Sequence, residues 1–124
     1  MHVQDTEVNI YAFDIDETLE VSRGPIKIHQ LIELKRQGHV VGLCGNWAVV
    51  IQAVRGWENL ISFIGPMEMS KTGFLNQLKT FIRADDYVMV GNIPGISGVS
   101  DDQNAAQQSG WRFIKESDFA EGAR

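Results

Sequence analysis

The sequence predicts an α/β protein in which helices cover both faces of a five-stranded parallel sheet. Short apolar segments alternate along the chain with longer segments in which apolar residues recur every three or four positions. Strands that alternate with helices through short connections form parallel sheets. With 124 residues the chain can bury a proper core, so we expect one domain over residues 1–124 with a Rossmann-like, three-layer α/β/α fold.

The first strand is predicted over residues 8–13, which are apolar at nearly every position, as is typical of a central strand. Residues 74–82 have the clearest amphipathic helical pattern. The tail at 115–124 is polar, with one helical turn expected around Phe119. Further strands are predicted at 39–44, 60–64, 87–90 and 111–114, and further helices at 26–34, 47–55 and 101–109.

The composition argues against several classes of function. The net charge is −5 and no dense Lys/Arg cluster exists, so we expect no binding to nucleic acid or to a membrane. The single cysteine, Cys44, excludes an internal disulfide and a zinc site made of cysteines. The N-terminus lacks the pattern of a signal peptide, and no apolar run approaches the ~20 residues of a membrane helix. We therefore expect a cytoplasmic protein.

Asp14 and Asp16 directly follow the first predicted strand. In an extended chain residues i and i+2 face the same side, so the two carboxylates are expected to lie close together. Like charges at this range disfavour ionisation unless a cation lies between them or one carboxyl keeps its proton. Both arrangements are useful for catalysis. The alternative is that Asp16, Glu17 and Thr18 form a solvated turn.

Other polar residues lie near the ends of other predicted strands. Residues 44–46 end the second strand, residues 91–92 end the fourth, and Lys71 lies in the connection after the third. In open parallel sheets ligands bind beyond the carboxyl ends of the strands, where the strand order reverses. We therefore expect these residues to meet Asp14 and Asp16 at one edge of the sheet.

Taken together, these segments resemble the motifs of the haloacid dehalogenase (HAD) superfamily of phosphohydrolases. The stretch Asp14-Ile15-Asp16-Glu17-Thr18 fits the first motif, Asp-x-Asp-x-Thr after a hydrophobic strand. Lys71 before an amphipathic helix fits the third motif. Gly91-Asn92, with Asp102 in the helix that follows, resembles the fourth. The resemblance covers nearly the whole chain and implies a HAD-like fold.

The resemblance also implies a mechanism. Asp14 would be the nucleophile that forms an aspartyl phosphate, and Asp16 would be the general acid and then the general base. Repulsion from its neighbour would favour a protonated Asp16. Lys71 would stabilise charge on the phosphoryl oxygens. The implied Mg²⁺ ligands are Asp14, the carbonyl of Asp16, Asn92, Asp101 and Asp102.

The second motif would bind phosphate through Cys44, Gly45 and Asn46, together with Lys71. Here the chain departs from the family, which has Ser or Thr in place of Cys44. The alternative is that Cys44 is a small buried apolar residue. Asn46 is also a candidate N-cap of the following helix.

The fourth motif departs as well. Asn92 stands where the family has Asp, which leaves one formal charge fewer for the metal. The loop from Asn92 to Asp102 is longer than usual, so Asp101 and Asp102 are both candidates, and the spacing from Asp102 to Gly110 favours Asp102. The alternatives are that both acids complement the dipole of a helix and that Lys71 is a surface charge.

Many members of the family carry a cap domain over the site. Here residues 17–40 and 47–70 each have room for one helix and its loops, so no cap is expected. An open site would admit a large substrate or be closed by a second copy of the chain. Trp47 is expected at the rim of the site or in the core, and Ser22 and Arg23 are expected to be loop residues.

The expected function is therefore a Mg²⁺-dependent phosphomonoester hydrolase that acts through an aspartyl phosphate on Asp14. One alternative is a domain that binds phosphate or a phosphorylated partner without turnover. Another is a response-regulator receiver, which also combines paired acids, Mg²⁺ and a lysine. Receivers place the acceptor aspartate after a middle strand of the sequence, where this chain has none.

Overall fold

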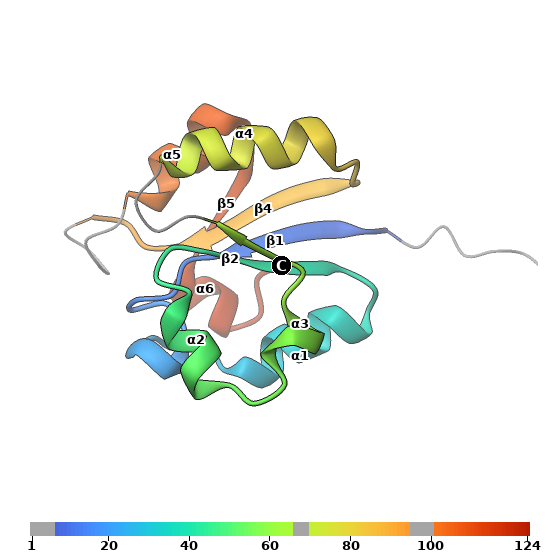
Figure 1. Cartoon of the computed structure of the whole chain (residues 1–124). Coiled ribbons are helices and arrows are strands. Elements are labelled where there is room, and N and C mark those ends of the chain that lie inside the picture. Colours follow the sequence, from blue (N-terminus) through green and yellow to red (C-terminus); the bar gives the residue numbers. More distant parts are fainter. Residues whose placement is uncertain (1–6, 66–69, 95–100) are drawn as a thin grey trace, which may run out of the picture.

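The computed structural model describes residues 7–65, 70–94 and 101–124. Five strands form one sheet in the order β3-β2-β1-β4-β5, and every neighbouring pair is parallel (Figure 1). This confirms the predicted fold class. The strands are β1 (Asn9–Phe13), β2 (Val40–Cys44), β3 (Phe63–Gly65), β4 (Asp86–Gly91) and β5 (Arg112–Lys115).

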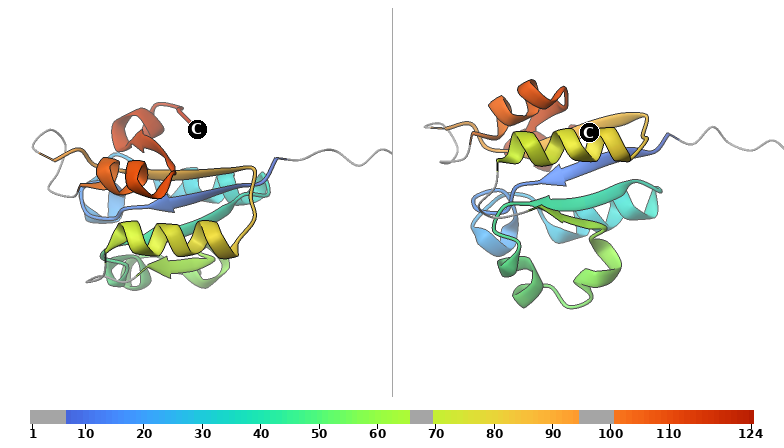
Figure 2. Two further views of the ribbon diagram at one scale, coloured as in Figure 1. Left: turned by 90° about the horizontal axis from the view of Figure 1, so that it is seen from above. Right: turned by 45° about the horizontal axis from the view of Figure 1, so that its top comes forward.

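Helices cover both faces of the sheet, as predicted. Figure 2 shows α4 (Lys71–Phe81) and α5 (Asp102–Ser109) side by side over one face. The other face is covered by α1 (Ile28–Arg36), α2 (Ala48–Ala53), α3 (Trp57–Leu60) and α6 (Glu116–Ala120) (Figure 1). Among the described residues no helix is long and apolar enough to span a membrane.

Strand β1 divides the core in two because its side chains alternate between the faces. Tyr11 and Phe13 pack edge-on against Phe119 on the side of α1 and α6. Ile10 and Ala12 belong to a second cluster on the side of α4 and α5. All four β1 side chains are almost fully buried, which explains the unbroken apolar run in the sequence.

The strand order reverses beside β1. The chain runs from β1 through β2 to β3 on one side, then crosses to β4 and β5 on the other. The loops that follow β1 and β4 therefore diverge at the carboxyl edge of the sheet, where open α/β sheets bind ligands.

Between β1 and β2 the chain holds the short 3-10 helix η1 (Glu20–Ser22) and α1, and between β2 and β3 it holds α2 and α3. No cap domain is inserted in these two fully described segments. As expected from the sequence, the carboxyl edge beside β1 therefore carries only short elements.

Several boundaries differ from the sequence-based predictions. The strand predicted at 60–64 is wrong at its start, because Leu60 ends the helical turn α3 and the strand begins at Phe63. Helix α4 begins at Lys71, where Ser70 caps it by accepting a hydrogen bond from the Gly73 N–H at 3.3 Å. The turn around Phe119 is confirmed as α6, which buries that ring completely.

Candidate active site

Three charged side chains meet beyond the carboxyl end of β1. The Lys71 Nζ lies 2.9 Å from the Asp14 Oδ1 and 2.6 Å from the Asp102 Oδ1. Asp14 is 3% exposed and Asp102 is fully buried, whereas the Lys71 side chain keeps 22% of its surface in contact with solvent. Charge-assisted hydrogen bonds of this length are strong, so one ammonium group holds two carboxylates that lie far apart in the sequence.

The position of each charge follows from the fold. The Asp14 N–H donates to the Val90 carbonyl at 2.9 Å, so the sheet pairing continues one residue past β1. The alternation of β1 then directs the Asp14 side chain to the face covered by α4 and α5. Lys71 and Asp102 are the first residues of these two helices.

The electrostatics of the three groups are unbalanced, because two carboxylates share one cation. Burial, and then the charge of Asp102, raise the pKa of Asp14 from 3.8 to about 6 against the opposing effect of Lys71. Burial would lower the pKa of Lys71, but the charges of Asp14 and Asp102 outweigh it and raise that pKa. Lys71 is therefore a permanent cation, while Asp14 changes charge close to neutral pH.

Asp102 is held against the backbone at the end of β4. Its Oδ2 accepts a hydrogen bond from the Asn92 N–H at 2.8 Å. A Cβ atom on Gly91 would overlap the Asp102 carboxylate, so only glycine lets it approach this closely. The glycine of the fourth motif thus fixes one wall of the site.

Thr18 and Asn92 lie beside the other oxygen of Asp14. The Thr18 hydroxyl lies 3.1 Å from the Asn92 Oδ1 and 3.4 Å from the Asp14 Oδ2. The Asn92 Nδ2 donates to the Glu17 carbonyl at 3.2 Å, which keeps the Asn92 oxygen turned toward Thr18. No role was predicted for Thr18, although its place four residues after Asp14, within the stretch that resembles Asp-x-Asp-x-Thr, was the signal that could have suggested one.

Asp16 does not join Asp14 and Lys71. Its Oδ1 accepts a hydrogen bond from the Ser22 hydroxyl at 2.6 Å and lies 3.4 Å from the Asn46 Nδ2. A turn brings Ser22 back to Asp16, since the Glu17 N–H donates to the Ser22 carbonyl at 2.8 Å. Ser22 was expected to be an ordinary loop residue, and its contact with Asp16 was not foreseen.

Asp14 and Asp16, which were predicted to lie close together, therefore have different neighbours. The like charge that contributes to the raised pKa of Asp14 is Asp102. The expectation that the carboxylates of Asp14 and Asp16 face the same side assumed an extended chain. The chain instead turns after β1, where the N–H groups of Thr18 and Leu19 both bond to the Ile15 carbonyl.

Residues 44–46, which were predicted to bind phosphate together with Lys71, lie in different environments. Cys44 is fully buried in the core beneath α4, and burial raises the pKa of its thiol to about 12, so it fits the alternative of a small apolar residue. Asn46 does not cap α2, whose N-cap is Trp47. The side-chain amide of Asn46 instead faces Asp16.

Gly45 lies close to Asp14 and Lys71. Its backbone has a φ of +140°, which favours glycine, and a Cβ atom there would lie 2.9 Å from the Asp14 Oδ1 and 3.8 Å from the Lys71 Nζ. Only glycine therefore lets the backbone after β2 approach the Asp14 carboxylate this closely.

Asp101 lies away from this centre. It is exposed and caps α5 by accepting a hydrogen bond from the Asn104 N–H at 3.2 Å. Trp47 packs against the core cluster on the α1 side, in agreement with the core alternative. Of the loop between Asn92 and Asp102, residues 95–100 lie outside the described residues.

The predicted metal ligands are only partly brought together. The Thr18 hydroxyl lies between Asp14 and Asn92, whereas Asp102 binds Lys71 and Asp101 caps α5. The contact of Asp16 with Ser22 involves its side chain and not the backbone carbonyl that was predicted as the ligand. In the described part of the chain, no group of three or more His, Cys, Asp or Glu residues is arranged to hold a metal ion. Any metal at this edge would thus depend on neutral oxygens and water as well as on carboxylates.

Comparison of the chain with protein-family models, with curated proteins and with solved structures gives no match.

Proposed function

We propose that the protein is a Mg²⁺-dependent phosphomonoester hydrolase that acts through an aspartyl phosphate on Asp14. The observation that carries this proposal is the lysine held between Asp14 and Asp102 at the point where the strand order reverses. A carboxylate that attacks phosphorus needs a fixed positive charge beside it, because the transferred group is itself anionic. Gly45 lets the backbone after β2 lie close to both groups.

The residues of the site divide the reaction between them. A carboxylate oxygen of Asp14 would attack phosphorus as the bond to the leaving oxygen breaks, and Asp16 would donate the proton that this oxygen needs. Asp16 would then accept a proton from the water that hydrolyses the aspartyl phosphate. Lys71 would stabilise negative charge on the phosphoryl oxygens throughout.

The residues around Asp14 fit a hard divalent cation. The two buried carboxylates exceed the single lysine by one negative charge, and Asp14 and Asn92 present oxygen atoms around the same hydroxyl. Mg²⁺ prefers oxygen ligands and keeps several waters, so it does not need an all-carboxylate site. We infer that Asp14, Asn92 and the Asp16 carbonyl would hold the ion, which would neutralise charge on the phosphoryl group.

The test is hydrolysis of p-nitrophenyl phosphate with and without Mg²⁺. We expect Asp14→Asn to lower the rate by at least about 10³-fold, since the nucleophile is lost. The matched control is Asp101→Asn, which keeps a good N-cap residue on α5 and should leave the rate unchanged. Activity that survives the Asp14→Asn substitution would refute the assignment of the nucleophile.

A second candidate function is Mg²⁺-dependent binding of phosphate or a phosphorylated partner without turnover. It is favoured by Asn92, which brings no charge to the site, and by the limited set of acidic ligands. Absence of hydrolysis across a broad panel of phosphate esters, combined with saturable binding of inorganic phosphate that requires Mg²⁺, would support it instead.

A further inference from the structure

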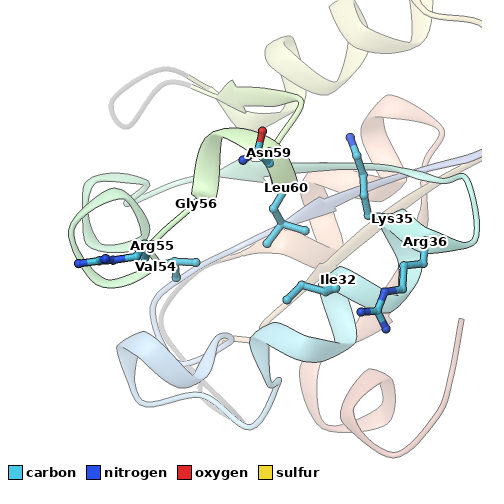
Figure 3. Close-up of a pocket in the computed structure, with 8 residues that line it drawn as sticks. All are labelled: Ile32, Lys35, Arg36, Val54, Arg55, Gly56, Asn59 and Leu60. Carbon is cyan, nitrogen blue, oxygen red and sulfur yellow. The ribbon is translucent and has the colours of Figure 1, made fainter.

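A pocket of about 290 Å³ lies between α1 and the segment that joins α2 to α3 (Figure 3). Helix α1 is followed directly by β2, and α3 by β3, so the ends of these helices lie near the starts of the strands. Asp14 follows the carboxyl end of β1 instead. The pocket lies within the helical layer on the face opposite to α4 and α5, and it is therefore separate from the candidate active site.

The floor of this pocket is apolar. Ile32 on α1 and Leu60 on α3 point toward each other across it, and Val54 closes one side (Figure 3). Leu60 is part of the core, whereas Ile32 is 39% exposed, which is high for a large aliphatic side chain. An apolar ligand that covers Ile32 would remove this surface from water, and that burial favours binding.

The rim of the pocket is basic. Figure 3 shows Lys35 and Arg36 on one side and Arg55 on the other. None of the eight lining residues is acidic, although acidic residues outnumber basic ones in the whole chain by 16 to 11. The pocket is thus a local concentration of positive charge on a negative protein.

The contacts that Lys35, Arg36 and Arg55 make within the chain leave positive charge available to a ligand. The Lys35 Nζ donates to the Ser62 hydroxyl at 3.3 Å, and Arg36 makes an exposed ion pair with Glu33 at 3.8 Å. Within the described part of the chain no hydrogen bond or ion pair engages the side chain of Arg55. The dipole of α1 accounts for basic residues in its last turn, but it does not account for Arg55, which lies outside any helix.

We propose that this pocket binds a small amphipathic anion, with an apolar body over Ile32 and Leu60 and one carboxylate or similar acidic group at the basic rim. The volume lies at the lower end of the range for small-molecule sites, which favours a compact ligand. The acidic group would remain partly in water, because the cations lie on the rim.

The test is a titration of the ¹⁵N-labelled full chain, followed by two-dimensional NMR, with octanoate, 1-octanol and acetate as probes. Octanoate should give saturable shifts of the amide signals around Ile32, Arg55 and Leu60. Octanol, which has the same tail without the charge, should bind roughly two- to fivefold more weakly, as expected for loss of exposed ion pairs. Acetate should cause no saturable shift over the same concentration range.

Two variants separate the parts of the proposed site. Arg55→Gln should weaken octanoate roughly two- to fivefold and leave octanol unchanged. Ile32→Asn should weaken both probes, since it removes apolar floor. Both residues are exposed or half-exposed, so the fold should be kept, and thermal unfolding checks this. Arg83→Gln is the matched control, because Arg83 is an exposed arginine that does not line the pocket.

Equal affinities for octanoate and octanol, shifts that do not centre on the pocket, or no saturable shift would each overturn the proposal. If the pocket instead docked a partner protein, the titration would give no saturable shift. The experiment does not depend on the proposed phosphatase activity, so failure of one leaves the other standing.

Discussion

Lys71 is the residue on which the candidate site depends. It satisfies two buried carboxylates at 2.9 Å and 2.6 Å, and it is itself only partly exposed. A buried carboxylate that loses its counter-charge is costly, so the same contacts that stabilise the site also stabilise the fold. Burial, and then the charge of Asp102, raise the pKa of Asp14, because the one lysine that both carboxylates share does not offset them.

The first prediction concerns the stability cost of Asp14. In the unfolded chain Asp14 titrates near 3.8, and in the folded chain it titrates at about 6. Between these values the folded state holds a proton that the unfolded state has lost, so the wild-type protein loses stability as the pH rises through this window. Asp14→Asn lacks this titrating group, so it has no such loss. In the absence of divalent metal, its free energy of unfolding should rise relative to that of the wild type by up to about 3 kcal/mol between pH 4 and pH 8.

Urea unfolding of both proteins at several pH values, in the presence of a chelator, measures this difference. Carboxylates that do not interact with Asp14 titrate alike in the two chains, so their effects cancel in the comparison. A difference in unfolding free energy that stays constant with pH, or that changes in the opposite direction, would contradict the raised pKa of Asp14.

The second prediction concerns Ser22, whose hydroxyl donates to Asp16 at 2.6 Å. If Asp16 is the general acid and base, this hydrogen bond fixes the orientation of its carboxyl group. Ser22→Ala should then lower kcat roughly ten- to hundredfold, with little change in KM. This loss is smaller than the whole contribution of acid–base catalysis, because Asp16 itself is kept. Ser22→Thr keeps a hydroxyl and should restore most of the rate, whereas a purely structural role would affect kcat and KM alike.

At the scale of elements, the sequence was sufficient wherever a periodic pattern ran for a whole strand or helix. The apolar run of β1 predicted a central buried strand. The pattern of α4 correctly predicted that Leu75 packs on the core, but it also placed Phe81 on this face, and Phe81 is 81% exposed. The rule that ligands bind at the carboxyl edge of a parallel sheet was enough to group Asp14 and Lys71, whereas Asp102 was included only because of the resemblance to a known family. The same rule does not apply to Asp16, which lies in a turn rather than in a strand.

The short elements were the ones that sequence reasoning missed. Helical turns such as η1 and α3 are too short for a period to be recognised. Ser22 is placed against Asp16 by backbone hydrogen bonds within such a turn. Asp101 and Asp102 differ by one position at the start of α5, and one position turns a helical side chain by about 100°. The first caps the helix, and the second reaches Lys71.

The third prediction tests how β4 and α5 meet. Gly91→Ala would place a methyl group on the carboxylate of Asp102, which could then no longer lie against the Asn92 N–H. We expect a loss of about 1–3 kcal/mol of stability and a lower phosphatase rate, because Lys71 would be displaced with Asp102. The matched control is Gly73→Ala inside α4, where a Cβ has open space, and a gain of roughly 0.5–1 kcal/mol is expected.

Unfolding free energies from denaturant titrations measure both substitutions. Gly91→Ala with the stability and rate of the wild type would mean that the close contact between the end of β4 and Asp102 is not needed.

At the scale of the whole molecule, the two faces of the sheet carry different sites. Buried acidic groups share one lysine at the carboxyl edge, on the side of α4 and α5, and the helical layer on the other face holds a pocket with a basic rim. No inserted domain lies between β1 and β3. For the proposed hydrolase we therefore expect that the substrate can be large as well as small.

The last prediction links the proposed metal to the stability of the entire domain. A ligand that binds only the folded state stabilises it by RT ln(1 + [L]/Kd), which is about 2.7 kcal/mol when the ligand is at 100 times its Kd. For a domain of this size we expect Mg²⁺ at such a concentration to raise the unfolding midpoint by roughly 10 °C at pH 7.5. At this pH Asp14 is ionised and free to bind a cation.

Thermal unfolding with Mg²⁺, compared with NaCl at equal ionic strength, separates specific binding from screening. The stabilisation should largely disappear in Asp14→Asn, which removes the negative charge of the ligand, and in Asn92→Leu, which removes the oxygen near Thr18. It should persist in Asp101→Asn. If Mg²⁺ stabilised the wild type and Asp14→Asn equally, the ion would bind elsewhere, and the metal-dependent part of the proposed mechanism would have to be abandoned even if Asp14 proved essential for activity.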